Sequence, residues 1–168
     1  MSSIPVQSNK LIPRWLCFAA VVVMVALDQL TKSLVSQHLQ MGVPVTVLPG
    51  FDLLLAHNEG AAFSFLDDAG GWQRWRFATI SAVVSIALSL WLWRLPPGQR
   101  LLAVALTFTL AGAVGNLIDR IQLGYVVDFI SLYYAQWRFA TFNVADAAIS
   151  CGAVLLVLDV ILNGGAHD

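Results

Sequence analysis

The chain carries little charge. Only 11% of its 168 residues are Asp, Glu, Lys or Arg, and 9 basic and 10 acidic residues leave a formal net charge of -1. So few cations provide no basic surface for nucleic acid, and there is no acidic or basic tail. Instead, 58% of the residues are hydrophobic and the mean hydropathy is +0.75. This is more apolar surface than a soluble core of this size can bury, so we predict a single membrane domain over residues 1–168.

Cysteine and histidine are also scarce. Cys17 and Cys151 lie within apolar runs and form no C-x-x-C pair, and His38, His57 and His167 are scattered along the chain. Zinc and redox sites need such side chains at short, regular spacing. The sequence therefore predicts buried free thiols, no metal site and no cofactor.

Long apolar runs make up most of the chain. A bilayer core of about 30 Å is crossed by ~20 mostly apolar residues in a helix. The stretch "RLPPGQR" between the second and third runs is short and rich in helix breakers, so these two runs are expected to form an antiparallel hairpin. The predicted fold is an all-α membrane protein, a bundle of four transmembrane helices. The four spans lie at about residues 15–34, 77–93, 101–118 and 139–162.

Four spans put both termini on one side of the membrane and connections 37–76 and 119–138 on the other. The first connection contains "VPVTVLPGFDLLLAHN", which predicts a short hairpin or small sheet on the membrane surface. The following "DDAGGWQRWRF" is typical of an interfacial segment. Residues 37–76 are thus expected to form a small β-containing cradle and lid between the first two helices. Cations do not orient the bundle, because their numbers on the two sides are nearly equal.

Most polar residues of the spans lie toward the connection side. Connectivity alone gathers them at that face of the bundle. The i,i+4 pair of Asp28 and Lys32 is expected to close on itself or on the polar connection, and Asp119 is expected to form a structural ion pair with Arg120. The gathered residues are Asp28, Lys32, Asn116, Asp119, Arg120, Asp128, Asn143 and Asp146.

Two aspartates of this group are candidates for chemistry. Asp146 lies inside an apolar run, where a carboxylate is costly and usually has a partner and a function. Asp128 lies in the preceding connection and is free to swing toward it. Two carboxylates that approach each other share one proton, as in aspartic proteases. From the residues alone, a catalytic dyad, a proton or ion relay and a buried polar lock between helices all stay open.

Five sequence blocks extend the interpretation. They are "DQLTK" (28–32), "NEGAAFS" (58–64), "AGAVGNLIDR" (111–120), "VVDF" (126–129) and "FNVAD" (142–146). Together and in this order, they resemble the bacterial lipoprotein signal peptidase family, also called signal peptidase II. Ala111 stands where that family often has a second glycine, a difference that concerns helix packing and not chemistry.

The resemblance implies an intramembrane aspartic endopeptidase that cuts the signal peptide from diacylglyceryl-modified prolipoproteins immediately before the lipidated cysteine. It implies a multi-pass protein of the bacterial inner membrane with cytoplasmic termini and an active site near the periplasmic face. The expected partners are prolipoprotein substrates, membrane lipids and the inhibitor globomycin, and the protein is expected to act as a monomer. A small proton-coupled transporter and an intramembrane scaffold are the alternatives from other functional classes.

The resemblance also assigns roles to individual residues. It puts the catalytic aspartates at Asp128 and Asp146. We expect Asn116 and Arg120 to hold substrate backbone oxygens, and Asn58 and Asn143 to orient the aspartates and the connection. The full set of substrate-binding or supporting positions that it implies is Asp28, Lys32, Asn58, Gly60, Asn116, Asp119, Arg120 and Asn143.

Overall fold

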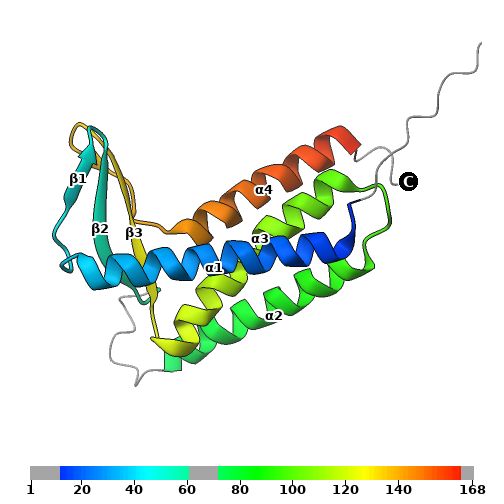
Figure 1. The fold of residues 1–168 in the computed structure, drawn as a ribbon, viewed down its shortest axis with the longest axis horizontal. Coiled ribbons are helices and arrows are strands. Elements are labelled where there is room, and N and C mark those ends of the chain that lie inside the picture. Colours follow the sequence, from blue (N-terminus) through cyan, green and yellow to red (C-terminus); the bar gives the residue numbers. More distant parts are fainter. Residues whose placement is uncertain (1–11, 61–71, 164–168) are drawn as a thin grey trace, which may run out of the picture.

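The protein is a bundle of four long helices with a small sheet at one end (Figure 1). A computed structural model describes residues 12–60 and 72–163. Each helix is long and apolar enough to cross a membrane, which confirms the predicted four-span, multi-pass architecture. The helices are α1 (Arg14–His38), α2 (Trp72–Arg94), α3 (Arg100–Gln122) and α4 (Val144–Asn163).

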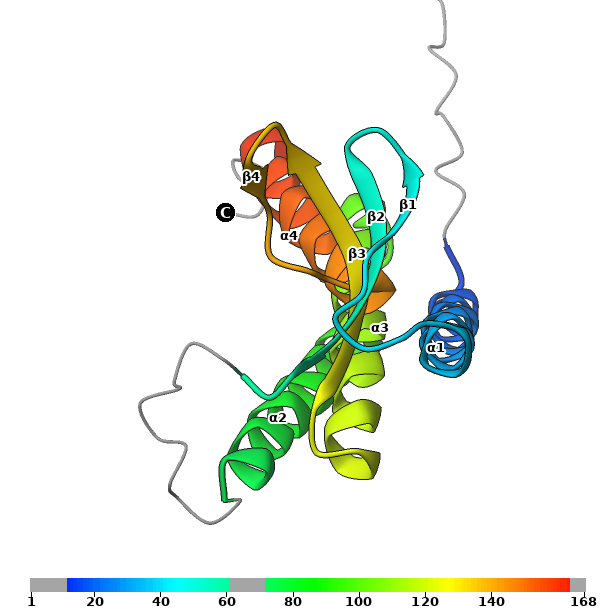
Figure 2. The ribbon, with the colours of Figure 1, turned by 90° about the vertical axis from the view of Figure 1, so that its left-hand side faces the viewer.

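Helix α3 is the central element of the bundle. It contacts each of the other three helices, and in the view from the sheet end α1, α2 and α4 lie around it (Figure 2). Its residues at the contacts include Ala105 and Leu106, which are fully buried, and Ala111 and Gly112. Small residues at such positions let helices approach closely where lipid supplies no hydrophobic driving force between them. Any polar residue on the inner face of α3 is therefore held against a neighbouring helix.

The sheet contains four antiparallel strands in the order β1-β2-β3-β4. The hairpin expected in residues 37–76 is present, but the second connection also forms strands, and β2 pairs with β3 across the two connections. The expected lid reaches into residues 61–71, which lie outside the described residues. The strand bounds are β1 (Val45–Leu48), β2 (Phe51–Asn58), β3 (Val126–Tyr134) and β4 (Trp137–Arg138).

Helix α4 begins later than predicted. The apolar run suggested a start near Phe139, yet the backbone of Phe142 still belongs to the sheet edge. Its N–H donates to the Ile130 carbonyl at 3.0 Å, and its carbonyl accepts the Ile130 N–H at 2.8 Å. Hydropathy does not distinguish a strand edge from the first turn of a helix, which explains the error. As a consequence, Asp146 lies in the first turn of α4.

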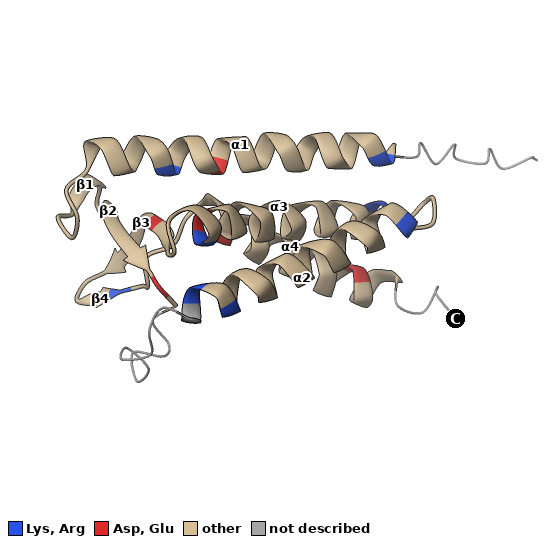
Figure 3. Cartoon of the chain, turned by 90° about the horizontal axis from the view of Figure 1, so that it is seen from below, with Lys and Arg blue, Asp and Glu red and all other residues tan. Residues whose placement is uncertain are grey.

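Charge is concentrated toward the two ends of the bundle. Figure 3 shows Lys, Arg, Asp and Glu near the sheet end and near the turn between α2 and α3, with little charge between them. Ionised groups are costly in the hydrocarbon core, so they collect where helix ends reach the interface. The sheet end is the one that holds the residues predicted to form the site.

Candidate active site

Asp128 is buried in strand β3, not in a mobile loop as the sequence suggested. Only 2% of the residue is exposed. In the β2–β3 pairing it lies opposite Ala56, so its backbone is held by the sheet. Its Oδ1 accepts a hydrogen bond from Asn143 Nδ2 at 2.8 Å, and its Oδ2 accepts one from Asn58 Nδ2 at 3.0 Å. The carboxylate is therefore fixed from both sides.

Asp146 lies in the first turn of α4 and forms a capping box with Asn143. The Asp146 N–H donates to Asn143 Oδ1 at 2.8 Å, and the Asn143 N–H donates to Asp146 Oδ2 at 3.3 Å. This reciprocal pair satisfies backbone groups that a helix start leaves open. Negative charge is also favourable at a helix N-terminus. The local sequence "NVAD" thus holds one carboxylate at a defined place by its own helix start.

Asn143 joins the two aspartates. Its backbone N–H donates a hydrogen bond to the Asp146 carboxylate. Its side-chain amide donates to Asp128 and also to Asn116 Oδ1, the latter at 3.2 Å. Asn116 in turn donates from Nδ2 to Asp146 Oδ1 at 2.7 Å. Carboxylates from β3 and α4 are consequently brought into one hydrogen-bonded cluster, in which Asp128 is buried and Asp146 is partly buried.

The environment favours a proton on Asp128. Burial raises the pKa of this carboxyl from its ordinary value of 3.8 to about 6. The nearby charge of Asp146 raises it too, whereas the donors Asn58 and Asn143 and the positive charge of Lys32 lower it. An aspartate that keeps its proton at mildly acidic pH, beside one at a helix start, is the asymmetry needed for paired acid and base chemistry.

A buried charge network lies next to Asp128 and Asp146. The Lys32 ammonium forms ion pairs with Asp28 at 2.8 Å and with Asp119 at 2.9 Å, and it donates to Asn116 Oδ1 at 3.0 Å. The predicted pairing of Asp28 with Lys32 is confirmed. The predicted pairing of Asp119 with Arg120 is wrong, because neighbouring positions on a helix point in different directions and Asp119 faces α1.

The network also fixes the backbone that carries both catalytic candidates. Asp28 Oδ1 accepts the N–H of Ala145 at 2.9 Å, at the start of α4, and Asp119 Oδ2 accepts the N–H of Val127 at 3.1 Å, directly before Asp128. The first bond joins α1 to the start of α4, and the second joins the end of α3 to the start of β3. The two acidic residues are therefore supporting groups that position the site.

Gln29 was missed by the sequence interpretation. Its amide donates to Asp119 Oδ1 at 2.8 Å, to the Gly115 carbonyl at 3.2 Å and to Asp28 Oδ2 at 3.3 Å. An uncharged polar residue beside the intramembrane Asp28 was the available signal. It ties α1 to α3 at the depth of the charge network.

Asn58 and Gly60 act together at the end of β2. The Gly60 N–H donates to Asn58 Oδ1 at 2.9 Å, which leaves the Asn58 amide group directed at Asp128. Gly60 has a φ of +93°, and a Cβ there would lie 2.6 Å from the ring of Phe77. Only glycine suits both conditions. The spacing in "NEG" thus orients a donor toward Asp128.

Arg120 lies on the other side of α3, facing α2. Its Nη1 donates to the Asn116 carbonyl at 3.3 Å and to Ser81 Oγ at 3.4 Å, and its guanidinium carbon lies 5.9 Å from the centre of the Phe77 ring. No carboxylate among residues 12–60 and 72–163 forms an ion pair with it. Its remaining N–H groups can therefore serve a ligand with carbonyl oxygens.

The described residues contain no group of three or more His, Cys, Asp or Glu side chains that could hold a metal ion. The carboxylates at the site accept hydrogen bonds from asparagine amides and backbone N–H groups, and Asp28 and Asp119 form ion pairs with Lys32. The chemistry available from these residues is proton transfer by two aspartates.

Relatives of the chain are lipoprotein signal peptidases. A profile of the signal peptidase (SPase) II family matches residues 20–162. The lipoprotein signal peptidase of Acinetobacter baumannii is 53% identical over 138 residues, which is 82% of this chain and 78% of that protein. The one from Hydrogenovibrio crunogenus is 47% identical over 152 residues, 90% of this chain and 86% of that protein. The one from Pseudomonas aeruginosa is 51% identical over 141 residues, 83% of each.

Two solved structures share the fold. Both are described as bacterial membrane enzymes determined by the in meso method. The structure at 1.9 Å resolution has a TM-score of 0.79 and 29% identity, covering 88% of this chain and 93% of the other. The structure at 2.3 Å resolution has a TM-score of 0.77 and 27% identity, covering 90% and 91%. Because the family profile and these relatives cover most of the chain, it belongs to the signal peptidase II family and is a membrane peptidase.

Proposed function

We propose that this protein cleaves the signal peptide from diacylglyceryl-modified prolipoproteins immediately before the lipidated cysteine, with Asp128 and Asp146 as its catalytic dyad. The observation that carries the proposal is the position of Asn143, which bonds both carboxylates and joins a strand to a helix start. Membership of the signal peptidase II family supports the substrate class and does not favour a transporter or a scaffold.

The chemistry follows from the two environments. Asp146, at the start of a helix, serves as the base that removes a proton from water, and the water oxygen bonds to the scissile carbonyl carbon. Asp128, whose pKa is raised, donates its proton to the carbonyl oxygen. When the tetrahedral gem-diol intermediate collapses, the C–N bond breaks and the leaving nitrogen takes the proton held by Asp146. One of the two hydroxyl groups gives its proton back to Asp128 as the C=O bond forms again. The dyad then returns to sharing one proton.

The surroundings suit a lipid-anchored peptide. The enzyme must bind such a substrate within the membrane. Its helices have apolar outer faces and one polar end. An extended peptide here presents backbone carbonyls to the N–H groups of Arg120. Asn116 is less available than expected for this task, because Lys32, Asn143 and Asp146 already occupy its amide. We assign substrate contact to Arg120 and positioning of the dyad to Asn116.

The same reasoning extends to location. The proposed site is the bacterial inner membrane, with both termini in the cytoplasm and the dyad near the periplasmic face, where lipid-modified precursors present their cleavage sites. The protein works as a monomer, with prolipoproteins and the surrounding lipids as its partners. Globomycin, the family's cyclic peptide inhibitor, is expected to compete with substrate.

The direct test is cleavage of a purified, diacylglyceryl-modified prolipoprotein by the wild type and by Asp128→Asn and Asp146→Asn. Each substitution is expected to reduce the cleavage rate about a thousandfold or more, because removing one member of a catalytic pair costs nearly as much activity as removing both. Asp52→Asn is the matched control: this buried carboxylate of β2 pairs with Arg138 in the sheet and not with the dyad. It should retain cleavage.

Two results would contradict the proposal. Cleavage that survives in both dyad variants would exclude these aspartates as the catalytic pair while leaving the peptidase activity intact. Wild-type cleavage of precursor that lacks the diacylglyceryl group, at the same rate as modified precursor, would exclude the proposed substrate class. Globomycin should block the wild-type reaction at saturating concentration.

A further inference from the structure

A cavity that is mostly apolar but contains two charged side chains lies at the opposite end of the bundle from the dyad. It has a volume of about 660 Å³ and lies between the end of α2, the start of α3 and the last turns of α4. Along α4 it is roughly 20 Å from Asp146, at 1.5 Å per residue. It therefore takes no part in the proposed cleavage. The lining includes Trp91, Arg94, Leu102, Leu156, Asp159 and Val160.

Asp159 is a buried carboxylate in this cavity that the proposed mechanism does not use. It is 6% exposed, and its Oδ1 accepts a hydrogen bond from Asn163 Nδ2 at 2.8 Å. Within the described part of the chain, no lysine or arginine forms an ion pair with it. A carboxylate inside a membrane helix is costly unless a cation or several donors meet it. Asp159 therefore has one hydrogen-bond donor but no positively charged partner.

Arg94 lines the same cavity from the other side. It is the last residue of α2, is exposed, and does not pair with Asp159. Trp91, one turn earlier, is 50% exposed, and an exposed tryptophan near a helix end is typical of the headgroup level. The cavity therefore has a positive wall and a negative wall at the level where lipid headgroups lie.

Apolar residues continue from the cavity along α4. Val160 forms part of its wall and is 69% exposed, and the neighbouring Val157 and Ile161 are also strongly exposed. In a membrane this face is covered by acyl chains. A ligand that reaches the cavity from the bilayer thus has apolar chains beside α4 and a polar group between the two charges.

We propose that the cavity binds a zwitterionic phospholipid with a primary ammonium headgroup, its phosphate against Arg94 and its ammonium against Asp159. Arginine matches phosphate oxygens through paired N–H donors. A primary ammonium can donate hydrogen bonds to the carboxylate, whereas a trimethylated one has no N–H to donate. An anionic headgroup would bring no cation to Asp159. The order of preference among lipids is therefore set by the two side chains.

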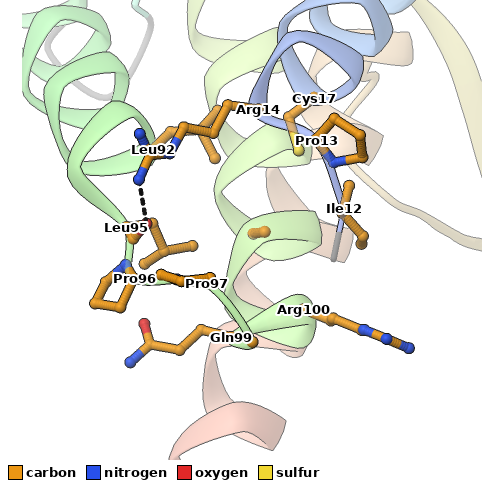
Figure 4. Close-up of a pocket in the computed structure, with 12 residues that line it drawn as sticks. Ile12, Pro13, Arg14, Cys17, Leu92, Leu95, Pro96, Pro97, Gln99 and Arg100 are labelled. Atoms are coloured by element: carbon orange, nitrogen blue, oxygen red, sulfur yellow. Dashed lines mark hydrogen bonds between the residues drawn. The ribbon is translucent and has the colours of Figure 1, made fainter. Parts of the chain in front are cut away.

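A neighbouring cavity supplies a matched control. It has a volume of about 270 Å³ and is lined by Arg100 on one side and by Arg14 on another, and Arg14 donates to the Leu95 carbonyl at 3.2 Å (Figure 4). Its lining includes Arg100 but neither Arg94 nor Asp159. Arg100→Gln therefore removes one charge at the same end of the bundle and leaves the proposed headgroup site unchanged.

The test is lipid binding to the purified full chain in detergent, followed by native mass spectrometry and thermal unfolding. Phosphatidylethanolamine is expected to bind about tenfold more tightly than phosphatidylcholine or phosphatidylglycerol with the same chains, the difference that one charge-assisted hydrogen bond supplies. Asp159→Asn should abolish this preference. Arg94→Gln should weaken the binding of all three lipids about tenfold. Arg100→Gln should leave the binding of all three lipids unchanged.

Several outcomes would overturn the assignment. Equal binding of the three lipids by the wild type would exclude headgroup selection. A preference that persists in Asp159→Asn would exclude the ammonium contact. Binding of soluble glycerophosphoethanolamine as tightly as the lipid would exclude a bilayer ligand. Stronger binding of a Lys-rich peptide than of any lipid would assign the cavity to the basic segment of a signal peptide instead. Prolipoprotein cleavage should be unchanged in all three variants, which separates this site from the dyad.

Discussion

Asn116 can direct its amide group at Asp146 in only one way, because an ammonium group accepts no hydrogen bonds. Lys32 donates to Asn116 Oδ1, so the Nδ2 side of the amide must face Asp146. Asn143 and Asn58 are oriented in the same manner, by the backbone N–H groups of Asp146 and Gly60. Three amides are thus oriented so that each donates to a carboxylate of the proposed dyad.

Lys32→Met is expected to destabilise the protein by about 3–5 kcal/mol, since it leaves two carboxylates buried without their cation. Thermal unfolding in detergent measures the loss. The double variant Lys32→Met/Asp119→Asn removes one of the stranded charges and should be more stable than the single variant. If the two variants unfold at the same temperature, Lys32 and Asp119 are not energetically coupled in the folded protein.

The stability of the protein should depend on pH through Asp128. Its pKa in the folded protein, about 6, lies above the ordinary value of 3.8 that an unfolded chain would have. The stabilisation from this group is therefore complete below about pH 3.8 and is lost as the pH rises through about 6.

The comparison that isolates this effect is wild type against Asp128→Asn, which has no carboxyl to titrate at this position. The difference in unfolding temperature, wild type minus variant, is expected to fall by a few degrees between pH 5 and pH 7.5. A difference that stays constant, or rises, would show that burial does not hold the proton on Asp128. Measuring differences cancels the titration of groups that both proteins share.

At the scale of elements, the approach of α3 to α4 determines where Asp146 lies. The structure puts the tightest contacts at Gly112 and Gly152, and a Cβ at Gly112 would lie 2.6 Å from Ile149 Cγ1. Gly115 instead makes room for Asp28, whose carboxylate oxygen would be 2.7 Å from a Cβ there. Glycines in α3 therefore serve both packing and the charge network.

Gly152→Ala tests this packing. A Cβ there would meet the Thr109 side-chain oxygen and lie 2.8 Å from the Thr109 backbone nitrogen and 2.9 Å from the Ala105 carbonyl. Backbone atoms cannot move away as a flexible side chain can, so we expect the free energy of unfolding to fall by about 1–3 kcal/mol. This loss is expected although alanine is otherwise the better helix former.

Thermal unfolding checks the loss, with Cys151→Ala as the control at the adjacent position, whose thiol is exposed and not buried as the sequence predicted. The control should unfold at the wild-type temperature. A Gly152→Ala variant that is as stable as the wild type would show that α3 and α4 are not in such close contact.

At the scale of the whole molecule, the sheet and the turn between α2 and α3 lie at opposite ends of the bundle (Figure 1). The proposed orientation puts the sheet in the periplasm. In a variant without Cys17 and Cys151, Thr46→Cys in β1 should react with a membrane-impermeant maleimide in intact spheroplasts. Pro97→Cys in the turn should react only after permeabilisation. The reverse pattern would invert the proposed topology, and retained cleavage would verify that each variant is folded.

Much of this architecture follows from local composition. Four apolar runs of bilayer length and short connections require a four-helix membrane bundle, and connectivity then brings Asp28, Asn116, Asp128 and Asp146 to one end. These predictions succeeded because lipid allows few backbone solutions other than helices. The sequence blocks added the family, and with it the identity of the two candidate catalytic residues.

The partners of each polar group, in contrast, depend on the tertiary structure. The pairing of β2 with β3 puts Asn58 beside Asp128. The packing of α1 on α3 directs Asp119 to Lys32 and not to its sequence neighbour Arg120. Hydrogen bonds and ion pairs act over about 3–4 Å, so they depend on which elements approach and on the face each presents. Periodicity and connectivity bring residues to the same end of a bundle, but only the packed backbone decides which atoms meet.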